Sequence, residues 1–336
     1  MKRILAVLLL FGMALSGCAE QGTRRQVFLM DTVVELQAYG AGSEEAIDRA
    51  VERLQELEGM FSPSDENSEI ERLNRAADSA AAAVSADLEN VLRQGISLTE
   101  ETGGAFDISL GRLIDLWDIK REHPAVPEED AIEQALQATG IENVALEGGK
   151  AALTAGVKLH VGGIAKGYAA NQVAELLRQA GVTSALFSIG GSIGAIGQSP
   201  GNKPWRVGIR DPDGSASSYI GTLPLRDQIV AVSGDYERFF EQDGVRYHHI
   251  LDASTGAPAR SGLRSVSVLC SDGAQADALS TALFVMGKER ALAFWRAHRD
   301  FECVLVEEGR RVTVTQGIAE EFALTDARYT CETAAW

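Results

Sequence analysis

Two oxygen-bearing side chains four residues apart are the first candidates for chemistry. Asp277 and Thr281 lie in a stretch whose apolar spacing predicts a helix, so both face the same side, and Asp272 precedes them on the connecting turn. A carboxylate and a hydroxyl are hard ligands of the kind that Mg²⁺ uses, completed by water or phosphate oxygens. An exposed acid beside a threonine bonded to its own helix also explains the pattern, and taken alone the pattern favours this simpler interpretation.

A glycine-rich turn is the second candidate. The sequence GGIAKG occupies residues 162–167, between an apolar segment (157–161) that predicts a strand and a predicted helix over 165–180. Free N–H groups at a helix N-terminus attract phosphate, and Lys166 would add a fixed positive charge there. A plain strand–turn–helix with a solvated lysine fits the local pattern equally well. The chain has neither a usable GxGxxG fingerprint nor a Walker P-loop.

An adjacent histidine pair is the third candidate. His248 and His249 lie within RYHHILDASTG (246–256), at the predicted end of a strand, where alternation sends the two rings to opposite faces. Only one ring can therefore point into a site, and a neutral histidine is the usual general base near pH 7. A half-buried strand histidine is an equally good explanation. The chain has no HExxH motif and no kinase signature, and no local motif indicates a standard hydrolase.

The elements that must position these residues follow one another irregularly. Helices are predicted at 43–57, 87–98 (with Asp87 as its cap), 131–138, 165–180, 274–286 and 288–298. Strands are predicted at 27–39, 142–147, 151–154, 157–161, 184–190, 205–210, 219–225, 228–233, 246–251, 263–269, 302–307 and 311–315. This order lacks regular β-α-β alternation and a clean linker. It predicts an α+β fold with antiparallel sheets and packed helices, in one elaborate domain over residues 27–336.

Composition excludes several classes of protein. The chain has 336 residues, of which 45% are hydrophobic and 24% charged, so a disordered chain, a collagen-like repeat and a disulfide mini-scaffold are excluded. Lys and Arg number 31 against 48 Asp and Glu, a net charge of -17. Such a charge repels phosphate backbones and anionic lipid, so we expect no nucleic acid partner.

The N-terminus resembles a bacterial lipoprotein signal. Lys2 and Arg3 precede an apolar run over 4–15 that is too short to span a bilayer comfortably, as in a secretory signal peptide. The sequence LSGC then resembles a lipobox, which makes 1–17 the signal peptide, Cys18 the lipidated residue and 18–26 a tether. An ordinary signal peptide with an accidental cysteine is the alternative. We expect a protein anchored by lipid to the periplasmic face of a bacterial membrane, inner or outer.

The other three cysteines are Cys270, Cys303 and Cys331. None lies in a CxxC or histidine-rich setting. They are interpreted as packing residues or as one optional disulfide, and the sequence does not choose the pair.

Taken together, these segments resemble the FAD:protein FMN transferase (ApbE) family over about residues 26–330. The matching segments, in the family's order, are FLMDT (28–32), FSPSDENSEI (61–70), TGGAFDISLGRLIDLW (102–117), VGGIAKGYAANQV (161–173), SIGGSIGAIG (188–197), WRVGIRDP (205–212), AVSGDYERFF (231–240), HHILDASTGAP (248–258) and DALSTALFVMG (277–287).

The resemblance implies a fold and a reaction. The fold is a T-fold-related α+β domain that binds FAD. The reaction is a Mg²⁺-dependent transfer of FMN from FAD to a Thr or Ser hydroxyl of a target protein, with release of AMP. The expected targets are flavin-accepting subunits of Rnf-type or Na⁺-pumping NADH:quinone reductase complexes.

The resemblance also assigns residues. His249 corresponds to the histidine that deprotonates the target hydroxyl, and the metal ligands correspond to Asp277, Thr281 and a backbone carbonyl placed at Gly163. Segments that contact FAD correspond to Met30, Ala105, Phe106, Asp107, Lys166 and, through its backbone, Leu251.

Four positions depart from the family pattern. His160 stands where an aspartate usually precedes the glycine-rich turn, and Ser64 where an aromatic residue often stacks near the flavin. Asn171 and Ser192 replace acidic or amide residues in flanking motifs. Two other functions therefore stay open: an FAD pyrophosphatase that uses water as the acceptor, and a non-catalytic lipoprotein that binds FAD.

Overall fold

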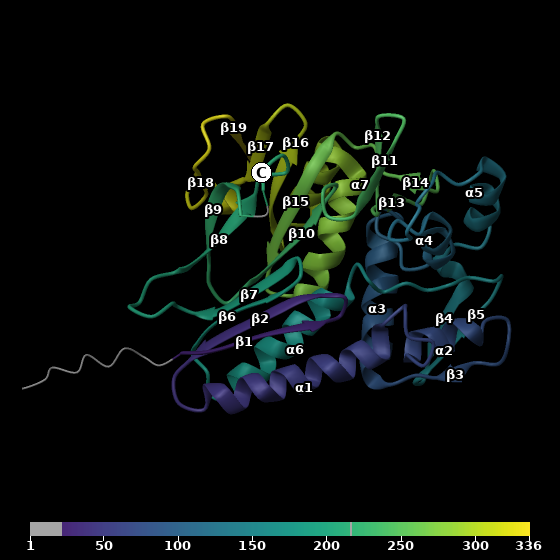
Figure 1. Cartoon of the computed structure of the whole chain (residues 1–336), viewed down its shortest axis with the longest axis horizontal. Coiled ribbons are helices and arrows are strands. Elements are labelled where there is room, and N and C mark those ends of the chain that lie inside the picture. Colours follow the sequence, from purple (N-terminus) through teal and green to yellow (C-terminus); the bar gives the residue numbers. More distant parts are fainter. Residues whose placement is uncertain (1–21, 216) are drawn as a thin grey trace, which may run out of the picture.

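The computed structural model describes residues 22–336 apart from residue 216, and a large sheet forms its centre (Figure 1). This nine-stranded sheet has the order β1-β2-β6-β7-β10-β15-β16-β17-β19. Its strands are β1 (Gly22–Leu29), β2 (Thr32–Tyr39), β6 (Ser184–Ile189), β7 (Ser192–Gly197), β10 (Ile229–Gly234), β15 (Leu263–Cys270), β16 (Glu302–Glu307), β17 (Arg311–Thr315) and β19 (Thr330–Ala334). Neighbouring strands are antiparallel except β17 and β19, which run parallel.

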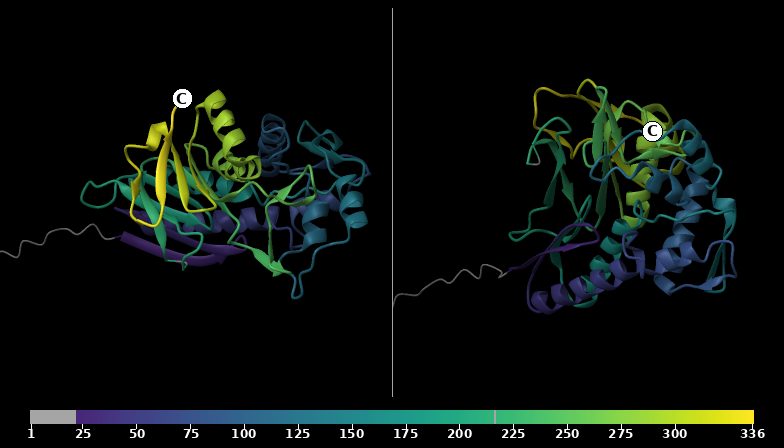
Figure 2. Two further views of the ribbon diagram at one scale, coloured as in Figure 1. Left: turned by 90° about the horizontal axis from the view of Figure 1, so that it is seen from above. Right: turned by 45° about the vertical axis from the view of Figure 1, so that its right-hand side comes forward.

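Three long helices cover one face of this sheet. They are α1 (Ser43–Phe61), α6 (Ala165–Gln179) and α7 (Gly273–His298). In α1 the buried residues recur every three or four positions, which gives the helix one apolar side to pack on the sheet. The views in Figure 1 and Figure 2 show α1 and α6 lying side by side along the first strands, and α7 follows β10 and β15.

A smaller sheet covers part of the other face. Its order is β18-β9-β8, from Ala323–Leu324, Tyr219–Leu225 and Trp205–Arg210. Trp205, Val207 and Leu223 pack there against outward-facing residues of the large sheet, including Val304 and Val314, to form a second apolar core. The large sheet is therefore buried on both faces over much of its area.

The remaining elements are helices outside the large sheet, a small sheet and two hairpins. They are α2 (Glu69–Arg75), α3 (Ala86–Glu101), α4 (Gly111–Trp117), α5 (Glu129–Leu136), η1 (Ile141–Asn143), η2 (Gln316–Ile318), the sheet β3-β5-β4 (Ala82–Ala83, Lys150–Leu153, Val144–Glu147), and the hairpins β11–β12 (Phe239–Gln242, Val245–His248) and β13–β14 (Leu251–Asp252, Ala257–Pro258). This arrangement confirms the predicted α+β class with antiparallel sheets in a single domain.

Several sequence-based boundaries were wrong. The predicted strand over 27–39 is a hairpin, and because β1 begins at Gly22, residues 22–26 belong to the sheet and not to a tether. Residues 157–161 form no strand; only Lys158 bridges Leu110. The cap of α3 is Ser85, whose hydroxyl accepts the Leu88 N–H, and not Asp87.

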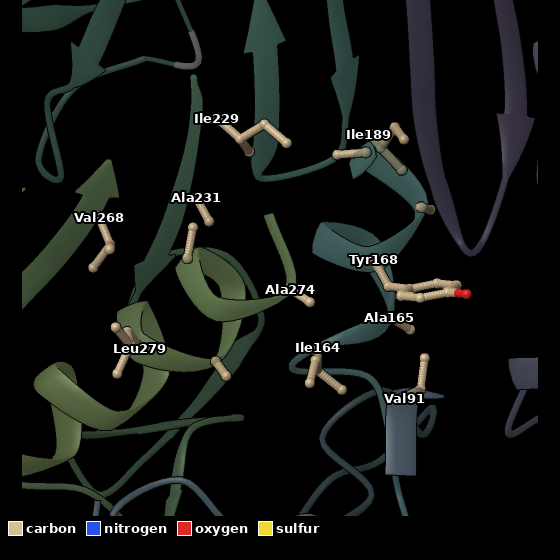
Figure 3. Close-up of a cluster of buried hydrophobic side chains, with 14 of the residues drawn as sticks. Val91, Ile164, Ala165, Tyr168, Ile189, Ile229, Ala231, Val268, Ala274 and Leu279 are labelled. Carbon is tan, nitrogen blue, oxygen red and sulfur yellow. The ribbon is translucent and has the colours of Figure 1, made fainter. Parts of the chain in front are cut away.

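A cluster of buried apolar side chains fixes the starts of α6 and α7 (Figure 3). Ile164, Ala165 and Tyr168 come from the first turn of α6, and Ala274 and Leu279 come from α7. Side chains of the β10 and β15 strands, among them Ile229, Ala231 and Val268, complete the cluster. Burial of these apolar side chains stabilises the positions of both helix starts.

Other sequence predictions meet the structure as follows. Cys270, Cys303 and Cys331 are all free thiols. Gly287, with φ 75°, breaks α7 between the two helices predicted at 274–286 and 288–298. No helix of the described residues is long and apolar enough to span a bilayer. The signal peptide (1–17) and Cys18 lie outside the described residues.

Candidate functional site

The starts of α6 and α7 meet at two glycines. A Cβ built on Gly167 would lie 1.9 Å from the carbonyl oxygen of Gly273, and one built on Gly273 would lie 2.4 Å from that of Gly167. Only glycine permits such a close approach of two backbones. Asn171 spans the same contact, because it donates to Asp272 Oδ1 at 2.7 Å and accepts the Gly273 N–H at 2.7 Å. The GGIAKG turn is thereby held against α7.

Asp277 lies beneath this turn and is 5% exposed. Its Oδ2 accepts the Gly167 N–H at 3.0 Å and lies 3.7 Å from Lys166 Nζ. Lys166 also donates to the Gly162 carbonyl at 2.7 Å. Among the described residues, the other oxygen, Oδ1, makes no hydrogen bond. It is also not completely shielded from solvent. One oxygen of a buried carboxylate is therefore free to bind a ligand.

Thr281 lies one turn further along α7. Its Oγ1 is 3.1 Å from Ser233 Oγ, which in turn is 2.8 Å from Ser280 Oγ. A Cβ built on Gly163 would lie 3.7 Å from Thr281 Oγ1, so the turn and the hydroxyl face each other. The structure thus brings together Gly163, Asp277 and Thr281, the three residues assigned to the metal.

The oxygen atoms at this corner fit a hard divalent cation. They comprise one carboxylate, one hydroxyl and the backbone of the turn, all ligands that Mg²⁺ or Ca²⁺ accepts. Within residues 22–336 as described, no cluster of three or more His, Cys, Asp or Glu side chains could hold a metal. A cation here would therefore complete its shell with water and with oxygens of an anionic ligand.

His249 follows the end of β12 and is held by Arg238. Its backbone N–H and its Nδ1 both contact the Arg238 carbonyl oxygen, at 3.1 Å and 3.3 Å. Since a carbonyl can only accept, Nδ1 carries the proton and Nε2 carries the lone pair that a base needs. Loss of solvation, and then the positive charge of Arg238, lower the pKa of His249 to about 3, with a smaller contribution from Lys166. The ring is neutral at pH 7.

His248, by contrast, is a core residue. It is 4% exposed, its Nε2 donates to the Ala259 carbonyl at 3.0 Å, and its Nδ1 accepts the Ile250 N–H at 3.3 Å. Its ring meets Phe284 edge to face, with 5.4 Å between centroids. Both nitrogens have partners, so the geometry leaves His249 as the histidine available for chemistry.

The tip of the β1–β2 hairpin reaches the same region. Met30 and Asp31 form its two-residue turn with φ values of 53° and 59°, a left-handed conformation that is uncommon outside glycine. The Met30 N–H donates to Glu58 at 2.7 Å, which ties the turn to α1. Asp31 pairs with Lys120 and with Arg238, the residue that holds His249.

Of the other residues assigned to FAD, Phe106 lies against the glycine-rich turn, whereas Leu251 lies elsewhere. Ala105 and Phe106 are buried after α3, and the Phe106 ring lies 3.1 Å from a Cβ built on Gly163. Asp107 accepts the Ser109 N–H at 2.7 Å, and burial raises the pKa of its carboxyl group. Leu251 is buried in a separate cluster with Trp117, where its side chain packs in the core.

The four departures from the family pattern occupy different settings. Burial, and then the charge of Lys166, lower the pKa of His160 to about 4, and its Nδ1 accepts the Gly162 N–H at 3.2 Å. Ser64 is exposed and bonds only Ser62 among the described residues. Asn171 joins α6 to α7, as described above, and Ser192 is buried with no partner for its hydroxyl in the described part of the chain. His160 thus supports the glycine-rich turn without adding charge.

Sequence reasoning missed four residues of this site. Ser233 and Arg238 lie in AVSGDYERFF and Asp31 in FLMDT, but single side chains in these segments carry no periodic or spacing signal. Gly167 lies in GGIAKG, and its role depends on a backbone 106 positions further along the chain. None of these roles follows from local sequence.

The chain is similar to proteins of known family and structure. The sequence model of the ApbE family matches residues 30–305. The chain is 34% identical to a FAD:protein FMN transferase of Treponema pallidum, over 92% of this chain and 91% of the relative. The structure resembles an ApbE protein of Thermotoga maritima (TM-score 0.82, 34% identity, 88% and 98% of the two chains) and a flavin transferase ApbE of Vibrio cholerae (TM-score 0.79, 29% identity, 86% and 94%).

Proposed function

This chain belongs to the ApbE family and is an FAD:protein FMN transferase, and we propose that His249 and the corner formed by Gly163, Asp277 and Thr281 carry out the transfer. The observation that carries this assignment is the meeting of the GGIAKG turn with α7 beside Lys166. An anionic substrate in a protein with a net charge of -17 needs a local positive field. Lys166 and a bound cation supply that field.

The proposed metal is Mg²⁺, held by Asp277, Thr281 and the Gly163 carbonyl. When bound, such a cation neutralises charge on the FAD pyrophosphate as its P–O bond breaks. Ser233 supports the site by fixing the Thr281 hydroxyl at 3.1 Å. Lys166, one turn from Gly163, binds the phosphate oxygens as a fixed charge.

The proposed step is an in-line phosphoryl transfer. The oxygen of an acceptor Thr or Ser hydroxyl forms a bond to the FMN phosphorus, and the bond from that phosphorus to the bridging oxygen breaks, so that AMP leaves with the oxygen. The hydroxyl proton passes to Nε2 of His249. This base is needed because a free hydroxyl is a weak nucleophile, and the Arg238 carbonyl keeps His249 in the tautomer that can accept.

The proposed partners follow from the family and from the N-terminus. The acceptors are flavin-bearing subunits of Rnf-type or Na⁺-pumping NADH:quinone reductase complexes. Cys18 carries the lipid and holds the protein on the periplasmic face of a bacterial membrane.

Mass spectrometry of the acceptor tests this function. The purified protein is mixed with FAD, Mg²⁺ and a candidate acceptor subunit, and we expect a covalent FMN adduct on one Thr or Ser together with free AMP. Rapid release of AMP and FMN with no acceptor present would instead favour hydrolysis. Tight binding of FAD without AMP under any metal condition would contradict catalysis.

A further inference from the structure

Lys166 lies where the site needs a positive charge when no metal is bound. Its Nζ is 3.7 Å from Asp277 Oδ2 and 2.7 Å from the Gly162 carbonyl oxygen, and its side chain is 28% exposed. Within the described residues, no other ammonium or guanidinium lies within 4.0 Å of the Asp277 carboxylate. The ammonium therefore neutralises a buried acid that would otherwise face the site unpaired.

We infer that Lys166 is the counter-ion of the metal-free site and that it keeps the affinity for divalent cations low until the pyrophosphate of FAD arrives. The inference rests on the proposed function, which supplies the metal and the pyrophosphate. A cation on Asp277 and the Lys166 ammonium would share one carboxylate, and like charges a few ångström apart in a partly buried site repel. The negative charge of a pyrophosphate allows both cations to remain.

No other acid relieves this repulsion at close range. Asp277 is the only carboxylate within 4.0 Å of Lys166 Nζ in the described part of the chain. The residue before the glycine-rich turn is His160, whose lowered pKa, about 4, leaves it neutral at pH 7. Asp31 lies near enough to interact electrostatically with Lys166, but Lys120 and Arg238 already pair with the Asp31 carboxylate.

The inference has a thermodynamic consequence. If FAD raises the affinity for the cation, the cation must raise the affinity for FAD by the same factor. Lys166 then makes the binding of the two ligands cooperative. In a protein without the Lys166 charge, the cation should bind more tightly when FAD is absent, and FAD should raise the affinity for the cation by a smaller factor.

Binding of Mn²⁺, followed by its electron paramagnetic resonance signal, tests this without any catalytic readout. The full-length protein in detergent is titrated without FAD and then with saturating FAD. For Lys166→Met we expect about tenfold tighter Mn²⁺ binding without FAD and a smaller gain on adding FAD. Lys150→Met removes the same charge from an exposed position on β5 and should match the wild type. Thr281→Val should abolish Mn²⁺ binding both without and with FAD.

Two results would overturn the inference, and they differ in what else they affect. If Lys166→Met binds Mn²⁺ no more tightly than the wild type while Thr281→Val abolishes binding, Lys166 is not the counter-ion, but the metal site stands. If Mn²⁺ still binds to Thr281→Val, both without and with FAD, the metal site itself is misplaced. The acceptor assay above decides the transferase activity separately in either case.

Discussion

Arg238 joins the tip of the first hairpin to the candidate base. Its guanidinium donates to the Asp31 carboxylate at 3.1 Å and to the Asp31 carbonyl at 3.3 Å. Its own carbonyl receives the two contacts of His249. The left-handed turn at the tip of the first hairpin therefore holds Arg238, which lies more than two hundred positions later in the sequence. This relationship makes Asp31 a positioning residue for His249.

Replacing Asp31 tests that relationship. In Asp31→Asn the guanidinium loses its ionic partner, and we expect kcat to fall about threefold to fivefold, because an exposed ion pair contributes at most about 1 kcal/mol. The affinity for FAD should change less than kcat. Steady-state FMN transfer at varied FAD gives both values. An equal loss in Asp31→Glu, which keeps the charge, would contradict a positioning role for this ion pair.

Removing the candidate base should have a much larger effect. For His249→Ala we expect kcat to fall by roughly 10²–10⁴, the range typical for loss of a general base, while FAD still binds. His123→Ala, on an exposed connection, is the matched control and should transfer FMN at the wild-type rate. Quantitative mass spectrometry of the acceptor measures both. Transfer by His249→Ala at the wild-type rate would assign the proton to another group.

The sequence predicted the class of fold and most of the long elements for a simple reason. Helices such as α1 carry an apolar residue every three or four positions, and strands such as β16 contain a short uninterrupted apolar run. The pattern fails where structure depends on partners distant in sequence. β7, with the sequence SIGAIG, has too many glycines to be recognised as a strand, yet it pairs with β6 on one side and β10 on the other.

The site was partly predictable for the same reason. Asp277 and Thr281 share a helix face at any tertiary arrangement, so their spacing indicated a common site. Local pattern alone favoured an exposed acid, whereas Asp277 is buried, because the start of α6 covers it. The hairpin turn at Met30 and Asp31 was missed because Met30 is not a usual turn residue at positive φ and no glycine or asparagine accompanies Asp31. Its conformation depends on Glu58 and Arg238, which no local window contains.

The metal dependence should follow Asp277. In Asp277→Asn the oxygen toward the Gly167 N–H can remain, but the charge that a divalent cation requires is gone. We expect at least a hundredfold loss of FMN transfer at millimolar Mg²⁺, with excess chelator reducing the wild type to a similar level. Circular dichroism should show an unchanged fold. Wild-type activity that persists in excess chelator would rule out the metal step.

Stability should fall as the pH falls below the usual titration range of histidine. Burial lowers the pKa of His248 to about 4, whereas an unfolded histidine titrates near 6.5. Between these values the unfolded chain binds a proton that the folded chain does not, so the free energy of unfolding decreases from pH 6.5 toward pH 4. Urea unfolding at a series of pH values measures this slope. In His248→Gln the free energy of unfolding should decrease by on the order of 1–3 kcal/mol less over this interval than in the wild type. An unchanged slope would contradict the lowered pKa of His248.

Two glycine-to-alanine changes distinguish close packing at the site from simple helix propensity. In Gly167→Ala the new Cβ would lie 1.9 Å from the Gly273 carbonyl oxygen, a rigid backbone atom, so α6 and α7 must separate. We expect a loss of about 2–3 kcal/mol in the free energy of unfolding, typical of an overpacked core. Gly59→Ala in α1 meets nothing within 4 Å and should stabilise the protein by up to about 1 kcal/mol. If Gly167→Ala were as stable as Gly59→Ala, the two helix starts would not be in close contact, and the geometry around Asp277 would have to be revised.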